Sequence, residues 1–418
     1  MNSGKGVLNG FFLKSFLTCS WKLPIRAGER VLKGDRQDIQ NLLSFDEEMR
    51  QIVEAIKKFG PRNVSKIARE TKLPIETVRY RIGNQLRSMG IRFHVSINYL
   101  KLGLIRSWIV LDFSAHNLRS APDLLDLLSK KGYLTYYARV LPYGFYLAIS
   151  TIPYSAINKY RELLDELVRL EVLREYRMVD LQYLKHFSLR PEFYDFATKT
   201  WNIPWNTIDA VEKRDDKPIQ IDYSRSVIDK TDLLILKELQ INASQSIATI
   251  AKKIEMPEKN VRYHYRAHLV GSKIIDGYVV RWQGDKYHSD NKYIFSCFIE
   301  FTDINQKDLV NIFKVIENIP FTWFISLSVD KTHLVSQFFV PVTFYYDFLA
   351  YLSNRLTVYK EKYELFIVDI DSAKAYTLPF ESYNDKTGWN IDIDELVSFF
   401  KDKVRAISKS YMTDYVEK

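Results

Sequence analysis

The sequence predicts an α+β protein made of two tandem modules, each a three-helix unit followed by a βαββαβ sandwich. Two observations support this prediction: the sequence repeats itself at a nearly constant offset, and helical and strand patterns alternate in the same order in both copies. The chain has 418 residues, enough for two to four domains. Its hydrophobic content of 46% is sufficient for packed cores.

The repeat is clearest where residues 71–80, TKLPIETVRY, align with residues 254–263, IEMPEKNVRY, at an offset of 183. Further along, the offset becomes 188, so that the motif Trp-Asn-Ile at 201–203 aligns with the same motif at 389–391. A five-residue insertion in the second copy explains the change. A register sustained over this length indicates a duplicated module rather than an array of short repeats.

Each copy begins with three short segments in which apolar residues recur at helical spacing, with a proline at the start of the third. The apolar positions are Ile52, Val53, Ile56, Val64, Ile67, Ala68, Val78, Ile82 and Leu86 in the first copy, and Ile235, Leu236, Leu239, Ile247, Ile250, Ala251, Val261, Tyr265 and Leu269 in the second. Three short helices with a tight turn before the last are typical of a helix-turn-helix. The strand-like runs 91–98 and 274–282 predict that each unit is winged.

The rest of each copy alternates between strand and helix patterns in the order βαββαβ, a ferredoxin-like arrangement. The predicted strands are 106–113, 133–140, 143–152 and 174–181 in the first copy and 293–301, 321–328, 331–340 and 364–370 in the second, with helices 120–131, 155–168, 306–317 and 342–356. Helices would cover one face of each sheet. Packing of the two sheets against each other would bury the other face.

These patterns divide the chain into seven regions. They are a basic N-terminal extension (1–44), winged helix-turn-helix 1 (45–100), ferredoxin-like sandwich 1 (101–205), a linker (206–227), winged helix-turn-helix 2 (228–283), ferredoxin-like sandwich 2 (284–390) and a C-terminal helix or tail (391–418).

Composition narrows the class of partner. A net charge of +9 and a pI of about 9.1 favour polyanionic partners. Cys19 and Cys297 are the two cysteines, too few for a disulfide framework or a cysteine metal site, which favours a reduced, cytoplasmic setting. No apolar run approaches the ~20 residues of a spanning helix, so we expect no membrane partner.

Several segments resemble the leucine-responsive (Lrp/AsnC, feast/famine) regulators. The segment IDKTDLLILKELQINASQSIATIAKKIEM from Ile228 resembles the start of such a protein, as do ETVRYRIGNQLRSMGI from Glu76, KLGL from Lys101 and IIDGY from Ile274. The chain is similar to an archaeal tandem version of the family over roughly residues 45–200 and 228–390. The resemblance implies a winged helix-turn-helix that binds double-stranded DNA and a βαββαβ domain for dimerisation and effector binding.

Effector sites in this family use glycine and aspartate in the loop between the middle strands of the sandwich. The corresponding loops here read LPYGF from Leu141 and SVDKT from Ser328, and only Gly144 and Asp330 match the pattern. The resemblance therefore implies these two residues as candidates for binding a small-molecule effector.

A helix that enters the major groove needs cationic and amide groups on its outward face. Residues 76–94 carry four Arg and one Glu, and residues 258–273 carry two Lys, two Arg and one Glu, so each third-helix segment has a net charge of +3. The candidate DNA-binding residues are Thr77, Arg79, Tyr80, Arg81, Asn84, Arg87, Lys259, Asn260, Arg262, Tyr263, His264, Arg266 and Lys273. The alternative is that these residues form solvated helix faces.

Early positions in such a helix usually reach base edges. Thr77, Arg79, Asn260 and Arg262 are therefore the candidates for base contacts, because arginine pairs with guanine and asparagine with adenine. Lys259, Arg266, Arg87, Arg92 and Lys273 lie later or at the margins and are expected to bind phosphate.

The sequence gives less support to an enzymatic function. It contains no Gly-rich phosphate loop and no GxSxG, so we expect neither an enzyme nor a cofactor. His264 and His268 have a metal-compatible i, i+4 spacing, but no third ligand is evident, so we interpret them as DNA-facing or capping and expect no metal.

Two alternatives remain open beside a sequence-specific transcription regulator. Siroheme decarboxylases share this fold and come in paired modules, and His186, His288 and His333 are candidates for their tetrapyrrole site. The other alternative is a ligand-sensing scaffold that has lost DNA binding. Because ordinary Lrp/AsnC regulators are single modules that pair, the resemblance implies that the two modules of this chain form an intrachain pseudo-dimer, which could pair again into a larger homo-oligomer.

Overall fold

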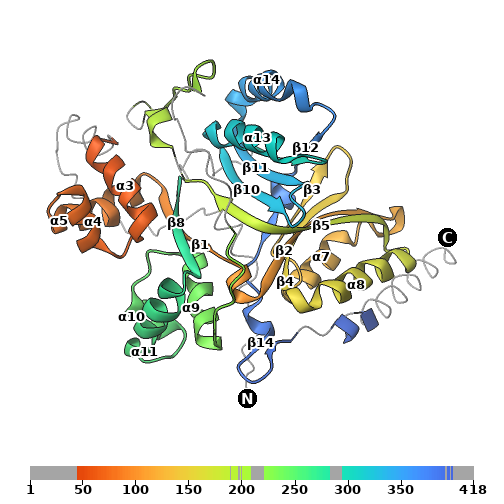
Figure 1. The fold of residues 1–418 in the computed structure, drawn as a ribbon, viewed down its shortest axis with the longest axis horizontal. Coiled ribbons are helices and arrows are strands. Elements are labelled where there is room, and N and C mark those ends of the chain that lie inside the picture. The colour runs from red at the N-terminus through yellow and green to blue at the C-terminus, as the bar shows by residue number, and fades with distance from the viewer. Residues whose placement is uncertain are drawn as a thin grey trace, which may run out of the picture.

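The protein is described by a computed structural model that covers residues 45–188, 190–195, 198, 200–208, 221–282, 294–390, 393–395 and 397–398. The predicted N-terminal extension (1–44), most of the linker (206–227) and nearly all of the tail (391–418) lie outside the described residues. The described elements confirm a mixed α+β fold (Figure 1).

The first helical unit consists of α3 (Glu47–Phe59), α4 (Val64–Thr71) and α5 (Ile75–Tyr80), and α5 continues through a π-helical segment, Arg81–Gln85, into α6 (Leu86–Ser88). Asp46 begins α3 by accepting the Met49 N–H at 2.8 Å. All predicted apolar positions of this unit are buried except Val64, which is half-buried. The helical periodicity therefore identified its core.

The second helical unit repeats this arrangement. It consists of α9 (Lys230–Ile241), α10 (Ile247–Lys253) and α11 (Glu258–Tyr263), and α11 continues as the π-helical segment His264–Gly271. Asp229 and Asp232 form a capping box at the start of α9. The predicted apolar positions are again buried, with Ile247 half-buried.

The strands that follow the two helical units differ from the prediction of two separate wings. β1 (Ile91–Ile97) and β8 (Ile275–Trp282) pair antiparallel with each other, with Phe93 opposite Val280, between the two sets of helices (Figure 1). A single strand in each unit leaves its backbone N–H and C=O groups without partners, and the equivalent strand of the other unit supplies them. One continuous core includes residues of both helical units and both strands.

Each half of the large sheet has the predicted element order βαββαβ. The first comprises β2 (Leu104–Phe113), α7 (Ala121–Lys130), β3 (Tyr136–Leu141), β4 (Tyr146–Pro153), α8 (Ile157–Arg169) and β5 (Leu173–His186), and the second comprises β9 (Ile294–Phe301), α13 (Gln306–Asn318), β10 (Thr322–Ser328), β11 (Leu334–Pro341), α14 (Tyr345–Leu356) and β12 (Tyr363–Val368). The strand orders β5-β2-β4-β3 and β12-β9-β11-β10 correspond.

The two halves join along both edges. β10 pairs with β5, and β12 pairs with β3, so the strands form a closed sheet, with the short β13 (Lys374–Ala375) added to β3. The end of β5 beyond residue 181 extends past its predicted limit because it pairs with β10. As expected, the aromatic inner faces cover each other: the rings of Trp108 and Phe298 lie 5.0 Å apart between centroids.

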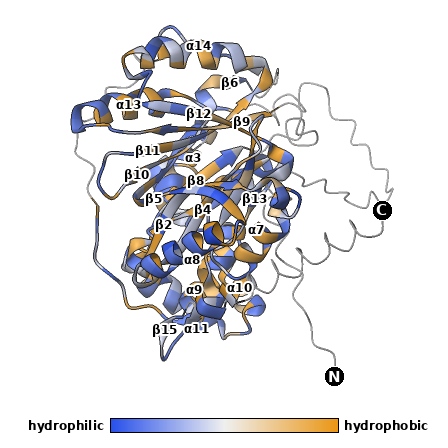
Figure 2. Ribbon diagram, turned by 90° about the vertical axis from the view of Figure 1, so that its right-hand side faces the viewer, coloured by the Kyte–Doolittle hydropathy of each residue, from blue (hydrophilic) through white to orange (hydrophobic). Residues whose placement is uncertain are grey.

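Helices cover the outer faces of this sheet, and α13 and α14 lie on the opposite side from α7 and α8 (Figure 2). Two short hairpins pack against the core of the helical units. They are β6 (Tyr194–Asp195) with β7 (Thr200–Trp201), and β14 (Tyr383–Asn384) with β15 (Gly388–Trp389). In the described part of the chain, no helix combines the length and apolar character needed to cross a membrane.

Candidate nucleic-acid interface

The two arginines proposed to read bases lie on the outward faces of α5 and α11. The side chain of Arg79 is 60% exposed and that of Arg262 is 46% exposed. Each forms an ion pair with a glutamate one turn earlier, Glu76 and Glu258 respectively. Exposed intrahelical pairs stabilise a protein by only a few tenths of a kcal/mol. The guanidinium groups can therefore exchange these carboxylates for phosphate or a base edge.

Most other candidates share this exposure. The exposed residues are Tyr80, Asn84 and Arg87 in the first unit and Lys259, Asn260, Tyr263, Arg266 and Lys273 in the second, whereas Thr77 is half-buried. Neither recognition face is covered by a described part of the sandwich. Both units therefore present a cationic helix to solvent.

Arg81 and His264, at equivalent positions, differ from the prediction because both turn inward. The Arg81 side chain is only 15% exposed, with Nη1 2.8 Å from Asp46 Oδ2, and it also contacts Glu48. The His264 side chain is 14% exposed, with Nδ1 3.0 Å from Asp232 Oδ1. The carboxylates at the start of the first helix attract these groups, so neither belongs to the outward face.

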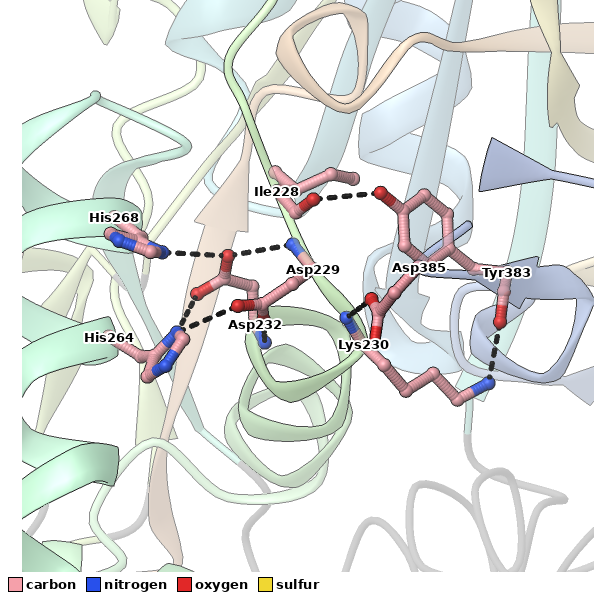
Figure 3. A network of polar contacts seen from close by, with 8 residues as sticks. All are labelled: Ile228, Asp229, Lys230, Asp232, His264, His268, Tyr383 and Asp385. Atoms are coloured by element: carbon pink, nitrogen blue, oxygen red, sulfur yellow. Dashed lines mark hydrogen bonds and ion pairs between the residues drawn. The ribbon is translucent and has the colours of Figure 1, made fainter. Parts of the chain in front are cut away.

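The sequence interpretation found no further ligand for His264 and His268, but the structure brings two aspartates to them. The His268 Nδ1 lies 3.0 Å from Asp232 Oδ2, and Asp229 completes the group (Figure 3). Burial raises the pKa of the Asp232 carboxyl, while its bonds to the two histidines oppose that rise. The Asp-x-x-Asp capping box is the sequence signal that could have identified these partners.

The two effector candidates lie in corresponding turns. Gly144 lies in the β3–β4 turn with φ of +88°, in open space, and Asp330 lies in the β10–β11 turn, where its Oδ1 accepts the Thr332 N–H at 3.0 Å. A small-molecule effector at these turns stays a prediction.

A cationic cluster of polar residues, Arg106, Arg281, His94 and His186, lies where β1 and β8 meet the large sheet. Arg281 is buried, and the other three residues are half-buried. Arg281 Nη2 lies 3.3 Å from His186 Nδ1 and donates to the Trp323 carbonyl at 3.0 Å. Arg106 Nε and Nη1 are buried without an acceptor among the described residues. Neither arginine forms an ion pair with a carboxylate of the described chain.

Burial dominates the electrostatics of this cationic cluster. It lowers the pKa of both arginines, and together with the nearby Arg281 charge it lowers the pKa of His94 to about 4 and that of His186 well below its usual range. Of the other tetrapyrrole candidates, His333 lies in the β10–β11 turn and His288 lies outside the described residues.

Comparison with known proteins gives partial matches. No protein-family model matches the chain. An uncharacterized HTH-type transcriptional regulator of Pyrococcus abyssi is 38% identical over 55 residues, which are 13% of this chain and 36% of that protein. The chain thus spans about a third of the curated relative it matches.

Two solved structures illustrate the partial matches. The siroheme decarboxylase NirDL is 11% identical and aligns over 85% of this chain and 99% of its own, with a TM-score of 0.49. An AsnC family transcriptional regulator from Agrobacterium tumefaciens is 14% identical and aligns over 35% of this chain and 98% of its own, with a TM-score of 0.28.

Proposed function

We propose that the protein is a sequence-specific DNA-binding transcription regulator with two helix-turn-helix readers in one chain. The observation that supports this proposal most is the exposure of Arg79 and Arg262 at equivalent positions on the third helices of two three-helix units. Arginine there can bind guanine bidentately, while Lys259 and Arg266 are available to phosphates.

The proposal extends to the organisation of the chain. Two tandem Lrp/AsnC-like modules of an archaeal type, acting in the cytoplasm, would explain the repeated helical units and the corresponding strand orders of the two sheet halves. Pairing of β1 with β8 and closure of the large sheet would make this chain its own pseudo-dimer, which could associate further.

The two readers would recognise an asymmetric site. Their helices differ in sequence, with Thr77 and Arg79 in one and Asn260 and Arg262 in the other. A shared core fixes the two units relative to each other. Readers on one face of DNA should therefore select half-sites separated by about 10 base pairs or a multiple of that spacing.

Selection of duplexes from a random pool by the purified full-length protein tests this proposal. We expect an enriched, non-palindromic motif with fixed half-site spacing. Affinity for the enriched duplex should fall steeply with salt, because several phosphate contacts release counterions. No enrichment, together with no salt-dependent retention of duplex, would reject DNA binding and favour a ligand-sensing scaffold.

A second candidate function is supported by the cationic cluster. Arg281 is buried, and two guanidinium nitrogens of Arg106 are buried without an acceptor among the described residues. Such burial is costly without a carboxylate partner, and a bound polyanion would offset that cost. A carboxylated tetrapyrrole, as used by a siroheme decarboxylase, has this chemistry. A saturable shift of the Soret band of an added iron tetrapyrrole, lost in Arg281→Gln, would support this function. A spectrum identical to that of the free ligand would reject it.

A further inference from the structure

His264, His268, Asp232 and Asp229 converge where the second recognition helix crosses the start of α9 (Figure 3). Each residue offers one donor atom, and the four donors all lie within 4.8 Å of one another. Asp232 is fully buried, and the Asp229 N–H donates to its Oδ2 at 3.1 Å, which fixes the orientation of the carboxylate.

We propose that these four residues form a binding site for a divalent transition-metal ion of the Zn²⁺ class. Two imidazoles and two carboxylates are a donor set that suits such ions, whereas Mg²⁺ and Ca²⁺ prefer oxygen alone. The site would also be electrically neutral, because two carboxylates balance a divalent cation and the two imidazoles bind in their neutral form.

The spacing of the donors fits this proposal. Ligands placed 2.0–2.1 Å from a tetrahedral ion lie about 3.3 Å apart. The His264 Nδ1 lies 3.0 Å from Asp232 Oδ1 and 3.5 Å from Asp229 Oδ2, and the His268 Nδ1 lies 3.0 Å from Asp232 Oδ2. Small side-chain rotations would therefore bring the donors around one ion, with each Nδ1 proton displaced and the other ring nitrogen protonated.

The first helical unit provides an internal comparison. At the repeat offset of 183, its residues corresponding to Asp232, His264 and His268 are Met49, Arg81 and Gln85. There, the Arg81–Asp46 ion pair links the recognition helix to α3 without any need for a metal. Where the first unit has an arginine that pairs with Asp46, the second unit thus has side chains that can each bind a metal ion.

A metal ion bound at this site would fix the position of the second recognition helix relative to α9. His264 directly follows Arg262 and Tyr263, so an ion bound to α9 through Asp232 would hold the exposed end of α11 in place. This consequence rests on the proposed DNA-binding function, whereas the metal site itself does not. Direct measurement of metal binding therefore separates failure of one proposal from failure of the other.

Titration of untagged, chelator-treated full-length protein with Zn²⁺ by calorimetry, and with Co²⁺ by absorption, tests the site. We expect one ion per chain, with intense visible Co²⁺ bands of tetrahedral coordination. His268→Gln and Asp232→Asn should each weaken binding at least 10-fold and reduce those bands. His116→Gln removes an exposed histidine of the sandwich and should leave binding unchanged.

The competing possibility is a hydrogen-bonded helix cap alone. No stoichiometric Zn²⁺ or Co²⁺ binding by the wild-type protein would overturn the metal proposal. So would equal affinity of the wild type and a His268→Gln variant whose circular dichroism and unfolding transition show that it is folded. Retained metal binding without DNA binding would instead contradict only the proposed function.

Discussion

The indole of Trp108 on β2 donates a hydrogen bond of 3.0 Å from Nε1 to Oε2 of Glu300 on β9, across the interior of the closed sheet. The Glu300 side chain is fully buried, and the same oxygen also contacts the Arg177 guanidinium. Burial raises the pKa of the Glu300 carboxyl, against the opposing effect of Arg177. The two halves of the chain are thus joined by a buried polar contact as well as by aromatic packing.

Trp108→Phe should destabilise the protein by roughly 1–3 kcal/mol, because it keeps most of the ring but removes the donor from a buried carboxylate. The free energy of unfolding measured in urea gives this value. Trp205→Phe is the matched control, since the Trp205 Nε1 has no hydrogen-bond partner among the described residues. Equal losses in the two variants would show that ring packing, rather than the hydrogen bond, accounts for the effect.

Arg262→Ala should weaken binding to a selected duplex by roughly 1–3 kcal/mol and relax base preference in one half-site, if the arginine contacts a base edge. Arg79→Ala should act on the other half-site. Arg119→Ala removes an exposed arginine from the sandwich and should leave affinity unchanged. Footprinting and equilibrium binding at fixed salt measure these effects, and an unaltered footprint in Arg262→Ala would reject its assignment.

Acidification should destabilise the protein through His94 and His186 of the cationic cluster. Burial lowers the pKa of His94 to about 4, below the ordinary value of 6.5, and lowers the pKa of His186 well below that ordinary value. Below pH 6.5 the unfolded chain binds protons that the folded chain does not, so the free energy of unfolding falls as the pH drops toward 4. Each histidine can contribute up to about 1.4 kcal/mol per pH unit.

Urea unfolding between pH 7.5 and 5 measures this slope. His94→Gln and His186→Gln should flatten it, whereas His116→Gln, which removes an exposed histidine, should not. If the slope persists in the double variant His94→Gln/His186→Gln, other groups control the acid sensitivity.

Local patterns predicted the helical cores, because apolar spacing in one helix decides which face it buries. The positions from Ile52 to Leu86 were correct for this reason. The strand β1, with its alternating burial, could also be predicted from the sequence. Its partner could not, because pairing with β8 joins segments more than 170 residues apart. The closure of β12 onto β3 is equally non-local.

The candidate nucleic-acid interface could likewise be predicted from local sequence only in part. Arg79 and Arg81 are both arginines on one helical segment, yet only Arg79 faces outward, because the carboxylates at the start of α3 pair with Arg81. The crossing of the first and third helices decides this, and spacing within one helix does not reveal it. For the same reason the partners of His264 emerged only from the structure.

Arg62 fixes the two helical units to each other. Its Nη1 donates to the carbonyl oxygens of Ala243 at 3.1 Å and Gln245 at 3.3 Å, and its guanidinium lies 4.3 Å from the centre of the Tyr265 ring. Because these contacts join the loop after α3 to the second unit, they set the relative orientation of the two readers. The spacing of half-sites should therefore depend on Arg62.

Arg62→Ala should lower stability by roughly 1–3 kcal/mol, since it leaves two buried carbonyls with fewer donors. Among duplexes with half-sites moved apart in single base-pair steps, the variant should discriminate less between spacings than the wild type does. Lys58→Ala, which removes an exposed ion pair with Glu70 and a contact with the adjacent Phe59 ring, should preserve that discrimination. An unchanged spacing preference in a folded Arg62→Ala protein would show that the shared β1–β8 core alone orients the readers.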